Sequence, residues 1–336
     1  MPAIVNVKTK PLASYLKTVA LVMPKGTNTI PLGITLQNNK FSIVSDAGGI
    51  YTEMSEVVAS KDACQVTCLY CDVASLLSGE ETEFEIDQYG VIMRGTGYET
   101  TFPIAYSSIE RIDKSDVSFK QMHDNGYIDS LKTILRINPE KLFSSVHPVT
   151  VYGDISLLKY PSMYVQARTM SLPFTAVFDL SHIRIITAMC PTEVSTDFSD
   201  SALFKRDSVL VQLPCKYLVE ENNFLSMLSD MESASLVDIA DHQNRLRDSV
   251  KFKGHLSCKI AIYPNGLRTT ITTENASIAV LTGETTREPI LTCTFPYQVW
   301  IAILTALGQG QVQILTGGQK LCLRTQSLAI LTSVIL

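Results

Sequence analysis

A short pattern that recurs along the chain constrains the fold more than any other feature. Residues 66–94, VTCLYCDVASLLSGEETEFEIDQYGVIMR, predict a strand, a short helix and a hairpin. Residues 291–324, LTCTFPYQVWIAILTALGQGQVQILTGGQKLCLR, predict the same elements in the same order. A third strand-into-helix junction, VLVQLP, lies at 209–214. Because a unit of this size cannot bury a core alone, the pattern predicts units that pair and pack in series.

Residues 1–106 contain the clearest copies of this unit. Residues 10–25, KPLASYLKTVALVMPK, predict an amphipathic helix, and residues 33–58 predict three antiparallel strands with Asn-Asn and Gly-Gly turns. Together with residues 66–94, they predict two tandem units of one strand, one helix and three strands. This is an α+β domain with helices on one side of antiparallel sheets. We expect the helix to bury five residues, namely Leu12, Tyr15, Leu16, Val19 and Met23.

The rest of the chain divides into three segments. Residues 107–131 are polar and poorly periodic, which predicts an inter-domain connector. Residues 132–206 predict one obvious unit, and residues 207–336 predict a C-terminal domain of two units. The count of units is about five. The middle segment is therefore either a degenerate or partial domain, or an insertion between two domains.

Within these segments, residues 133–137 (TILRI) and 183–189 (IRIITAM) predict strands, and residues 139–146 (PEKLFSSV) predict a helix. Two more helices are predicted, one near 215–230 and one at 297–307, YQVWIAILTAL.

No catalytic pattern emerges from the sequence. TGGQK has the glycines of a hairpin turn rather than of a phosphate-binding loop, and neither GxSxG nor HExxH occurs. Glu83, Glu85 and Asp87 predict a solvated strand face, not a catalytic carboxylate pair. The histidines are scattered, and we expect them at the surface, with His182 in a turn: His123, His147, His182, His242 and His255. We therefore expect a scaffold or binding protein without catalysis.

Cysteine usage and charge narrow the class further. Most of the eight cysteines lie in apolar runs, which predicts reduced, buried thiols. Cys64, Cys68 and Cys71 approach a metal spacing but lack a fourth ligand, so core packing is the preferred interpretation, and we expect no metal or cofactor. The net charge is −5, so any contact with DNA requires a local basic surface. With no apolar signal core and no run long enough to cross a bilayer, we expect a cytoplasmic protein.

The order and lengths of these elements resemble the DNA polymerase sliding clamps, the processivity-factor family that includes the bacterial beta clamp and the phage and eukaryotic ring clamps. The resemblance is carried by residues 10–25, 30–58 and 66–106, and it recurs over 208–336. It implies a closed ring with sheets outside and helices lining a hole for duplex DNA. Such a clamp tethers the polymerase and performs no chemistry.

The resemblance also implies DNA contacts by basic residues on the helices and entry strands. Lys10, Ser14 and Lys17 form a stripe opposite the apolar face of the first helix, although a solvated helix face looks the same. The predicted helices at 72–79 and 297–307 carry no Lys or Arg, so the lining would be only weakly basic. The implied DNA-binding residues are Lys8, Lys10, Lys17, Lys25, Lys132, Arg136, Lys141 and Lys216.

Partner proteins of clamps bind beside a domain connector and the C-terminal strand. Carried over, this implies a partner surface at the connector and the tail, although a tail that only completes a sheet is the alternative. The implied partners are sequence-independent duplex DNA, a polymerase and a clamp loader, in a homo-oligomer where a dimer is favoured over a trimer. A non-encircling monomeric accessory factor and a structural assembly protein are competing interpretations. The implied partner-binding residues are Ile109, Ile112, Val117, Phe119, Leu331, Val334, Ile335 and Leu336.

Overall fold

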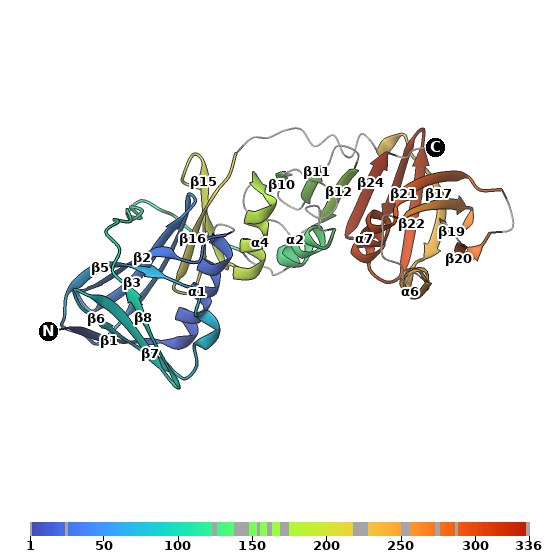
Figure 1. Cartoon of the computed structure of the whole chain (residues 1–336). Helices are drawn as coiled ribbons and strands as arrows, with labels where there is room; N and C mark the ends of the chain where they lie inside the picture. Colours follow the sequence, from blue (N-terminus) through green and yellow to red (C-terminus); the bar gives the residue numbers. More distant parts are fainter. Residues whose placement is uncertain are drawn as a thin grey trace. The chain divides into compact units, whose positions relative to one another are not determined.

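The computed structural model divides the chain into two compact units (Figure 1). Unit 1 contains residues 1–123 and 184–217, and unit 2 contains residues 124–183 and 218–336. The structure describes residues 2–23, 26–122, 126–137, 148–152, 155–159, 163–168, 175–217, 228–249, 256–272, 276–285 and 288–333.

The first two repeats of the unit follow the predicted order with one difference. The predicted two-turn helix after Asp72 is a single 3-10 turn, closed by the Leu76 N–H on the Val73 carbonyl at 2.9 Å and ended at Leu77, whose backbone is already extended. The Asp72 carboxylate accepts a hydrogen bond from the Ala74 backbone N–H at 3.1 Å and so caps this turn. The elements are β1 (Ala3–Lys8), α1 (Thr9–Val22), β2 (Ile30–Gln37), β3 (Lys40–Ala47) and β4 (Ile50–Val57), then β5 (Cys64–Tyr70), η1 (Ala74–Leu76), β6 (Glu81–Ile86), β7 (Gly90–Gly95) and β8 (Tyr98–Pro103).

The middle of the chain contains two repeats rather than one obvious unit. TILRI and IRIITAM were wrong as strands, because they lie in helices α2 and α4. In α2 the buried residues Tyr127, Ile128, Leu131 and Ile134 have helical spacing, but that pattern begins before TILRI. The predicted helix at 139–146 lies outside the described residues. The elements are β9 (Lys120–Gln121), α2 (Gly126–Arg136), β10 (Pro148–Tyr152), β11 (Ile155–Lys159) and β12 (Met163–Arg168), then β13 (Ala176–Asp179), α4 (Leu180–Met189), β14 (Glu193–Ser195), β15 (Ser201–Arg206) and β16 (Val209–Pro214).

The last two repeats include one predicted helix and one that the sequence pattern missed. Helix α7 occupies the residues predicted for it, whereas α6 had no predicted counterpart. Most of the helix predicted near 215–230 falls outside the described residues. The elements are β17 (Glu232–Asp238), α6 (Ala240–Ser249), β18 (Ser257–Tyr263), β19 (Asn265–Thr272) and β20 (Ser277–Glu284), then β21 (Leu291–Pro296), α7 (Tyr297–Leu307), β22 (Gln311–Gly317), β23 (Lys320–Arg324) and β24 (Leu328–Ser333). The described elements thus repeat six times, not about five.

Paired repeats exchange their first strands. β1 joins the sheet of β6, β7 and β8, while β5 joins the sheet of β2, β3 and β4. The same exchange places β9 beside β14, β13 beside β10, β17 beside β22 and β21 beside β18. Every pairing is antiparallel in the described residues, for example Ala3 with Ile86. A single repeat therefore cannot complete its own sheet, which explains why the units occur in pairs.

Two strand pairings join the pairs of repeats to one another. β4 pairs with β16 in unit 1, and β12 pairs with β24 in unit 2, so each joint produces an eight-stranded sheet. We call these the two internal joints. The equivalent last strands of the remaining half-sheets, β8 and β20, each end a four-stranded sheet. Two of the six equivalent edges are therefore unpaired within the described chain.

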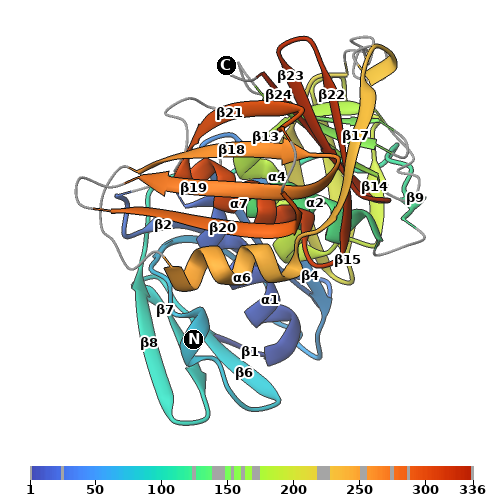
Figure 2. The ribbon, with the colours of Figure 1, turned by 90° about the vertical axis from the view of Figure 1, so that its right-hand side faces the viewer.

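Helices cover one face of each sheet. In unit 1, α1 packs on β4 and β16, and its buried Tyr15 hydroxyl accepts a hydrogen bond of 3.4 Å from Thr52 on β4. In unit 2, α7 contacts both α2 and α6. Helix α7 lies behind the sheet of β18 to β21, and α6 lies along its β20 edge (Figure 2). Trp300 of α7 is fully buried. The neighbours of Thr52 along β4, Tyr51 and Glu53, point to the opposite face of the sheet, since side chains alternate along a strand.

Candidate nucleic-acid interface and partner surface

Helix α1 places the predicted lysines in solvent. Lys10, Ser14 and Lys17 are exposed, whereas Leu12 and Leu16 are buried against the sheet. Tyr15 and Val19 are buried as well, and Met23, just past the helix, is partly buried. The amphipathic helix is thus confirmed, with its polar stripe free for a ligand. The role of that stripe in DNA binding stays a prediction.

The other predicted basic residues have different settings. On α2, Lys132 and Arg136 are exposed one turn apart, and Lys132 Nζ lies 3.5 Å from Asp129. Lys8 ends β1 with a side chain that is 76% exposed, 3.9 Å from Glu56. Lys216 is exposed just after β16. The two remaining residues of the set, Lys25 and Lys141, lie outside the described residues.

Helix α6 adds two arginines that sequence reasoning missed. Arg245 pairs with Asp241 at 3.1 Å, and Arg247 donates a hydrogen bond of 2.9 Å to Thr305 on α7. Both are exposed. Two signals could have revealed this helix: Asp238, whose carboxylate caps the Ala240 N–H at 3.0 Å, and the opposite charges of Asp241 and Arg245 at i, i+4. The low apolar content of ADHQNRLRDS hid it.

The first connector lies on the face of the unit 1 sheet opposite α1. We call residues 107–119 the strap. Its four predicted partner-binding residues pack on a buried cluster of Val44, Tyr51, Leu203 and Leu210. Gly33 makes room, because a Cβ there would lie 2.9 Å from Val44 Cγ2 and 3.7 Å from Ile109 Cδ1. The packed strap residues are Ile109, Ile112, Val117 and Phe119.

Polar contacts anchor the strap on both sides of the joint between β4 and β16. Arg111 donates a hydrogen bond of 2.6 Å to Ser42, and the backbone N–H of Ser118 donates one of 2.7 Å to Asp197. Between them, the Lys114 ammonium pairs with the buried carboxylate of Glu53. A pocket of about 270 Å³ opens beside this pair. The strap therefore fastens the joint as well as covering it.

Several groups hold the Glu53 carboxylate ionised. Burial acts to raise its pKa, but hydrogen bonds from Lys114, Tyr51 and Ser55 outweigh burial and place the pKa below its usual value. The Tyr51 hydroxyl donates at 2.7 Å and the Ser55 hydroxyl at 2.9 Å. The three donors compensate the Glu53 carboxylate for the hydrogen bonds to water that it loses on burial.

The C-terminal part of the predicted partner surface belongs to a different cluster. Leu331 of β24 is 3% exposed and packs in unit 2 with Leu315, Cys322 and Ala329. Leu228 and Met231 pack against this cluster. The connector residues and Leu331 thus lie in separate clusters of separate units. The other predicted tail residues, Val334, Ile335 and Leu336, lie outside the described residues.

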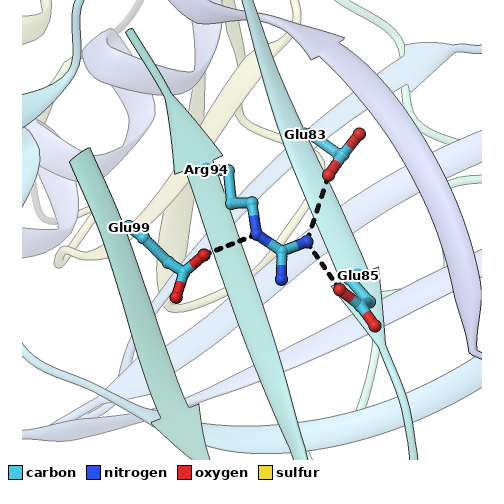
Figure 3. A network of polar contacts seen from close by, with 4 residues as sticks. All are labelled: Glu83, Glu85, Arg94 and Glu99. Atoms are coloured by element: carbon cyan, nitrogen blue, oxygen red, sulfur yellow. Dashed lines mark hydrogen bonds and ion pairs between the residues drawn. The ribbon is translucent and has the colours of Figure 1, made fainter. Parts of the chain in front are cut away.

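The acidic strand face is partly neutralised by a cation that sequence reasoning did not place there. Arg94 of β7 reaches Glu83 at 3.2 Å, Glu85 at 2.5 Å and Glu99 at 2.7 Å (Figure 3). The carboxylates, with Glu99 acting most strongly, raise the pKa of the Arg94 guanidinium above its usual value. Asp87 instead caps the β6–β7 turn. The face keeps an excess of negative charge.

The histidine prediction was wrong at both described positions. His182 lies in helix α4 rather than a turn and is 8% exposed, and His242 is fully buried. The His242 ring contacts Thr282 at 2.9 Å and Thr269 at 2.8 Å, and Trp300 donates to the same Thr269 hydroxyl at 3.1 Å. Burial lowers the pKa of His242 to about 4. The two threonine hydroxyls satisfy both nitrogens of the neutral ring in place of water, which allows this histidine to lie in the core.

The cysteine interpretation is confirmed for most thiols but was wrong for Cys71, which is exposed, while Cys64 is only half-buried at the start of the edge strand β5. Cys68, Cys258, Cys293 and Cys322 are buried, and the thiols are free. Within the described residues, His, Cys, Asp and Glu side chains form no group of three or more that could hold a metal ion. No described helix is long and apolar enough to span a membrane.

The architecture of paired repeats, exchanged strands and helix-covered sheets is the fold of the bacterial beta sliding clamps. The Helicobacter pylori beta clamp superposes with a TM-score of 0.76 at 9% identity, covering 99% of this chain and 100% of that one. The DNA polymerase sliding clamp of Bacillus subtilis gives 0.75 at 12% identity, with both chains covered completely.

A structure of the Helicobacter pylori beta clamp bound to a DNA ligase peptide gives 0.73 at 9% identity and covers 99% of this chain and 100% of that one. No family model matches the sequence, and the sequence matches no curated protein. The likeness is therefore one of fold, carried by structure and not by sequence.

Proposed function

We propose that this protein is a DNA sliding clamp that closes into a ring of two copies around duplex DNA. The observation that carries the proposal is the set of six equivalent last strands, of which four pair internally (β4 with β16, β12 with β24) and two, β8 and β20, stay unpaired within the described chain. A chain that only needed to be compact has no reason to leave matching edges, which invite pairing with another chain. Two copies joined through β8 and β20 use every such edge.

Charge supports this choice of edges. The solvent face beside β8 carries Glu83, Glu85 and Glu99 around the single Arg94. The solvent face beside β20 carries the exposed residues Lys259 and Arg268. Opposite charges on neighbouring strands stabilise a sheet, and they favour a head-to-tail contact over contacts between like edges.

In this proposal, the helices face DNA and bind it without reading sequence. Lys10 and Lys17 of α1, Lys132 and Arg136 of α2, and Arg245 and Arg247 of α6 are exposed cations on the helical side of the sheets. Contacts of lysine and arginine with phosphates are independent of sequence and weaken with salt, as sliding requires. η1 and α7 carry no Lys or Arg, which keeps the grip weak.

The partners follow from the same model. The clamp performs no chemistry and tethers a DNA polymerase through two separate surfaces. One is formed in unit 1 by the strap residues Ile109, Ile112, Val117 and Phe119, and the other lies in unit 2 around Leu331. The peptide bound to the Helicobacter pylori clamp supports a peptide-binding role for this fold. A clamp loader would open one joint between the copies. The domain boundaries predicted from the sequence, with a middle domain near 132–206, stay part of this proposal.

The deciding experiment measures mass and topology together. Light scattering of the 37.0 kDa chain should give twice that mass, and the protein loaded on nicked circular DNA should stay bound until the circle is linearised. Leu281 on β20 is 43% exposed, so Leu281→Glu should repel the acidic β8 face and yield monomers. Leu281→Lys is the matched control that should still dimerise. A monomer that binds linear and circular DNA equally would favour the non-encircling accessory factor instead.

A further inference from the structure

A groove at one end of unit 1 is used neither by the proposed ring joint nor by the proposed DNA contacts. It has a volume of about 690 Å³ and lies between the start of β1 and the start of β5, closed at one side by the β6–β7 turn. Ile4, which lines it, is 49% exposed. A groove of this volume is within the range that binds a ligand of several residues. The lining residues used below are Ile4, Asp62, Gln65, Val66, Asp87 and Ile104.

Two open strand edges border this groove. β1 pairs only with β6, and β5 pairs along its length only with β2. The Lys8 backbone N–H turns away from β6 to reach Glu56 at 3.1 Å, so the same alternation directs the backbone groups of Ile4 away from β6. Backbone donors and acceptors on an open edge are a ready template for another strand.

The open side of β5 already takes an extended segment at its next position. Cys68 forms an antiparallel bridge with Ile104, and the Ala105 N–H donates a hydrogen bond of 2.8 Å to the Thr67 carbonyl. The chain then leaves the edge, and its next residue, Tyr106, is fully exposed. By alternation, the backbone groups of Gln65 point to the same open side as the Thr67 carbonyl. The edge is thus competent for strand addition and stays open where it borders the groove.

The charge of the groove defines what kind of strand fits. Its charged lining residues are Asp62 and Asp87, and neither Lys nor Arg lines it among the described residues. Val66, Ile104 and the exposed Ile4 supply apolar surface. An extended segment that alternates apolar and basic side chains would meet both kinds of lining, since successive side chains of a strand face opposite ways.

We propose that this groove binds an extended segment of a partner protein as an added strand on β5. The backbone of that segment pairs with Gln65 and its neighbours. Its apolar side chains pack on Ile4, Val66 and Ile104, and a lysine or arginine pairs with Asp62 and Asp87. This is recognition by strand addition, in which main-chain bonds give affinity and side-chain contacts give specificity.

The test uses the full chain and three fluorescent eight-residue peptides. One alternates valine with lysine, one alternates valine with glutamate, and one is the lysine peptide with prolines at alternate positions. In fluorescence anisotropy the lysine peptide should bind at least tenfold more tightly than either of the others. Asp62→Lys should weaken its binding tenfold, while Glu80→Lys, at an exposed position outside the groove, should leave it unchanged.

A second readout locates the bound peptide. Cys64 lines the groove, and Cys71 is exposed outside it. The lysine peptide should slow alkylation of Cys64 by iodoacetamide and leave Cys71 unaffected, as measured by mass spectrometry. Equal binding of the lysine and glutamate peptides, unchanged alkylation of Cys64, or no binding of any peptide would each overturn the proposal.

Discussion

The first pair of repeats, β1 to β8, and the last pair, β17 to β24, share one sheet plan but differ in their helices. The first pair has α1 and the three-residue η1, whereas the last has α6 and α7. Helix α7 is apolar nearly all round because it contacts α2 and α6 besides its own sheet, while α1 keeps an exposed face with Lys10 and Lys17. Strand exchange fixes the sheets, and the helices vary with their neighbours.

Trp300 gives the largest expected difference between the two pairs. Trp300→Ala removes the fully buried indole from the last pair and should cost about 3 to 5 kcal/mol in the free energy of unfolding. Leu76→Ala in η1, where the side chain is 49% exposed, should cost about 0.5 kcal/mol or less. Urea unfolding followed by circular dichroism measures both. Trp300→Phe, which keeps an aromatic ring, separates packing from the bond to Thr269. Similar losses for Trp300→Ala and Leu76→Ala would contradict the comparison.

His242 should make the last pair sensitive to acid. Its folded-state pKa of about 4 lies below the ordinary 6.5, so the unfolded state binds the proton first as pH falls. Stability is therefore complete above about pH 6.5 and should fall by about 3 kcal/mol by pH 4. Fluorescence of Trp300, the one tryptophan, follows this pair during urea unfolding. His242→Gln cannot titrate, so its fluorescence midpoint should lose this part of the pH dependence. An equal pH dependence in the variant would remove His242 as the cause.

The strap fastens the joint between β4 of the first pair and β16, and we expect the ion pair between Lys114 and Glu53 to contribute most of its polar anchoring. Lys114→Met leaves the Glu53 carboxylate, with a side chain 5% exposed, without its cation, and should cost about 3 kcal/mol. Hydrogen exchange in residues 107–119 should rise at the same time. The double variant with Glu53→Gln should recover part of the loss, because no buried charge remains. A loss that the second substitution fails to reduce would show that packing, not charge, holds the strap.

The smallest effect is expected at Arg94. Arg94→Met leaves Glu83, Glu85 and Glu99 close together on a half-exposed face, where salt screens their repulsion. The melting temperature should fall by a few degrees at low salt and recover in high salt. Lys320→Met, at an exposed position on β23 of the last pair, is the control, with no such salt dependence. A deficit that persists in high salt would indicate lost packing of the arginine stem.

The sequence predicted local structure well where the whole hydrophobic pattern of an element, or the residues of its turn, could be recognised. Helix α1 and the turns at Asn38 and Asn39, both with positive φ, follow directly from the residues. Helix α2 was missed because its first turn, with Tyr127 and Ile128, was assigned to the predicted connector. The Ile-rich remainder of the helix then has the pattern of a strand. α6 was missed because its apolar stripe is narrow.

Long-range features could not be read from the sequence. No local pattern predicts that β5 pairs with β2 of the preceding repeat. Nor does one predict that Arg94 forms ion pairs with three carboxylates on two strands. The sequence around His242 predicts a surface residue, because the hydrogen-bond partners that allow its burial, Thr269 on β19 and Thr282 on β20, are distant along the chain. The strap residues were identified as apolar and available, but their cluster comes from β3, β4, β15 and β16.

Strand exchange and the internal joints also fix the order in which the sheets can form while the chain is synthesised. Ala3 finds its partner only when Ile86 has left the ribosome, and Met54 must wait for Val209. Contacts this distant along the chain close slowly and leave edges bare in the meantime. The nascent protein therefore spends much of its translation with unpaired strands, and a chaperone that shields β1 and β4 would act at the stage where misassembly is easiest.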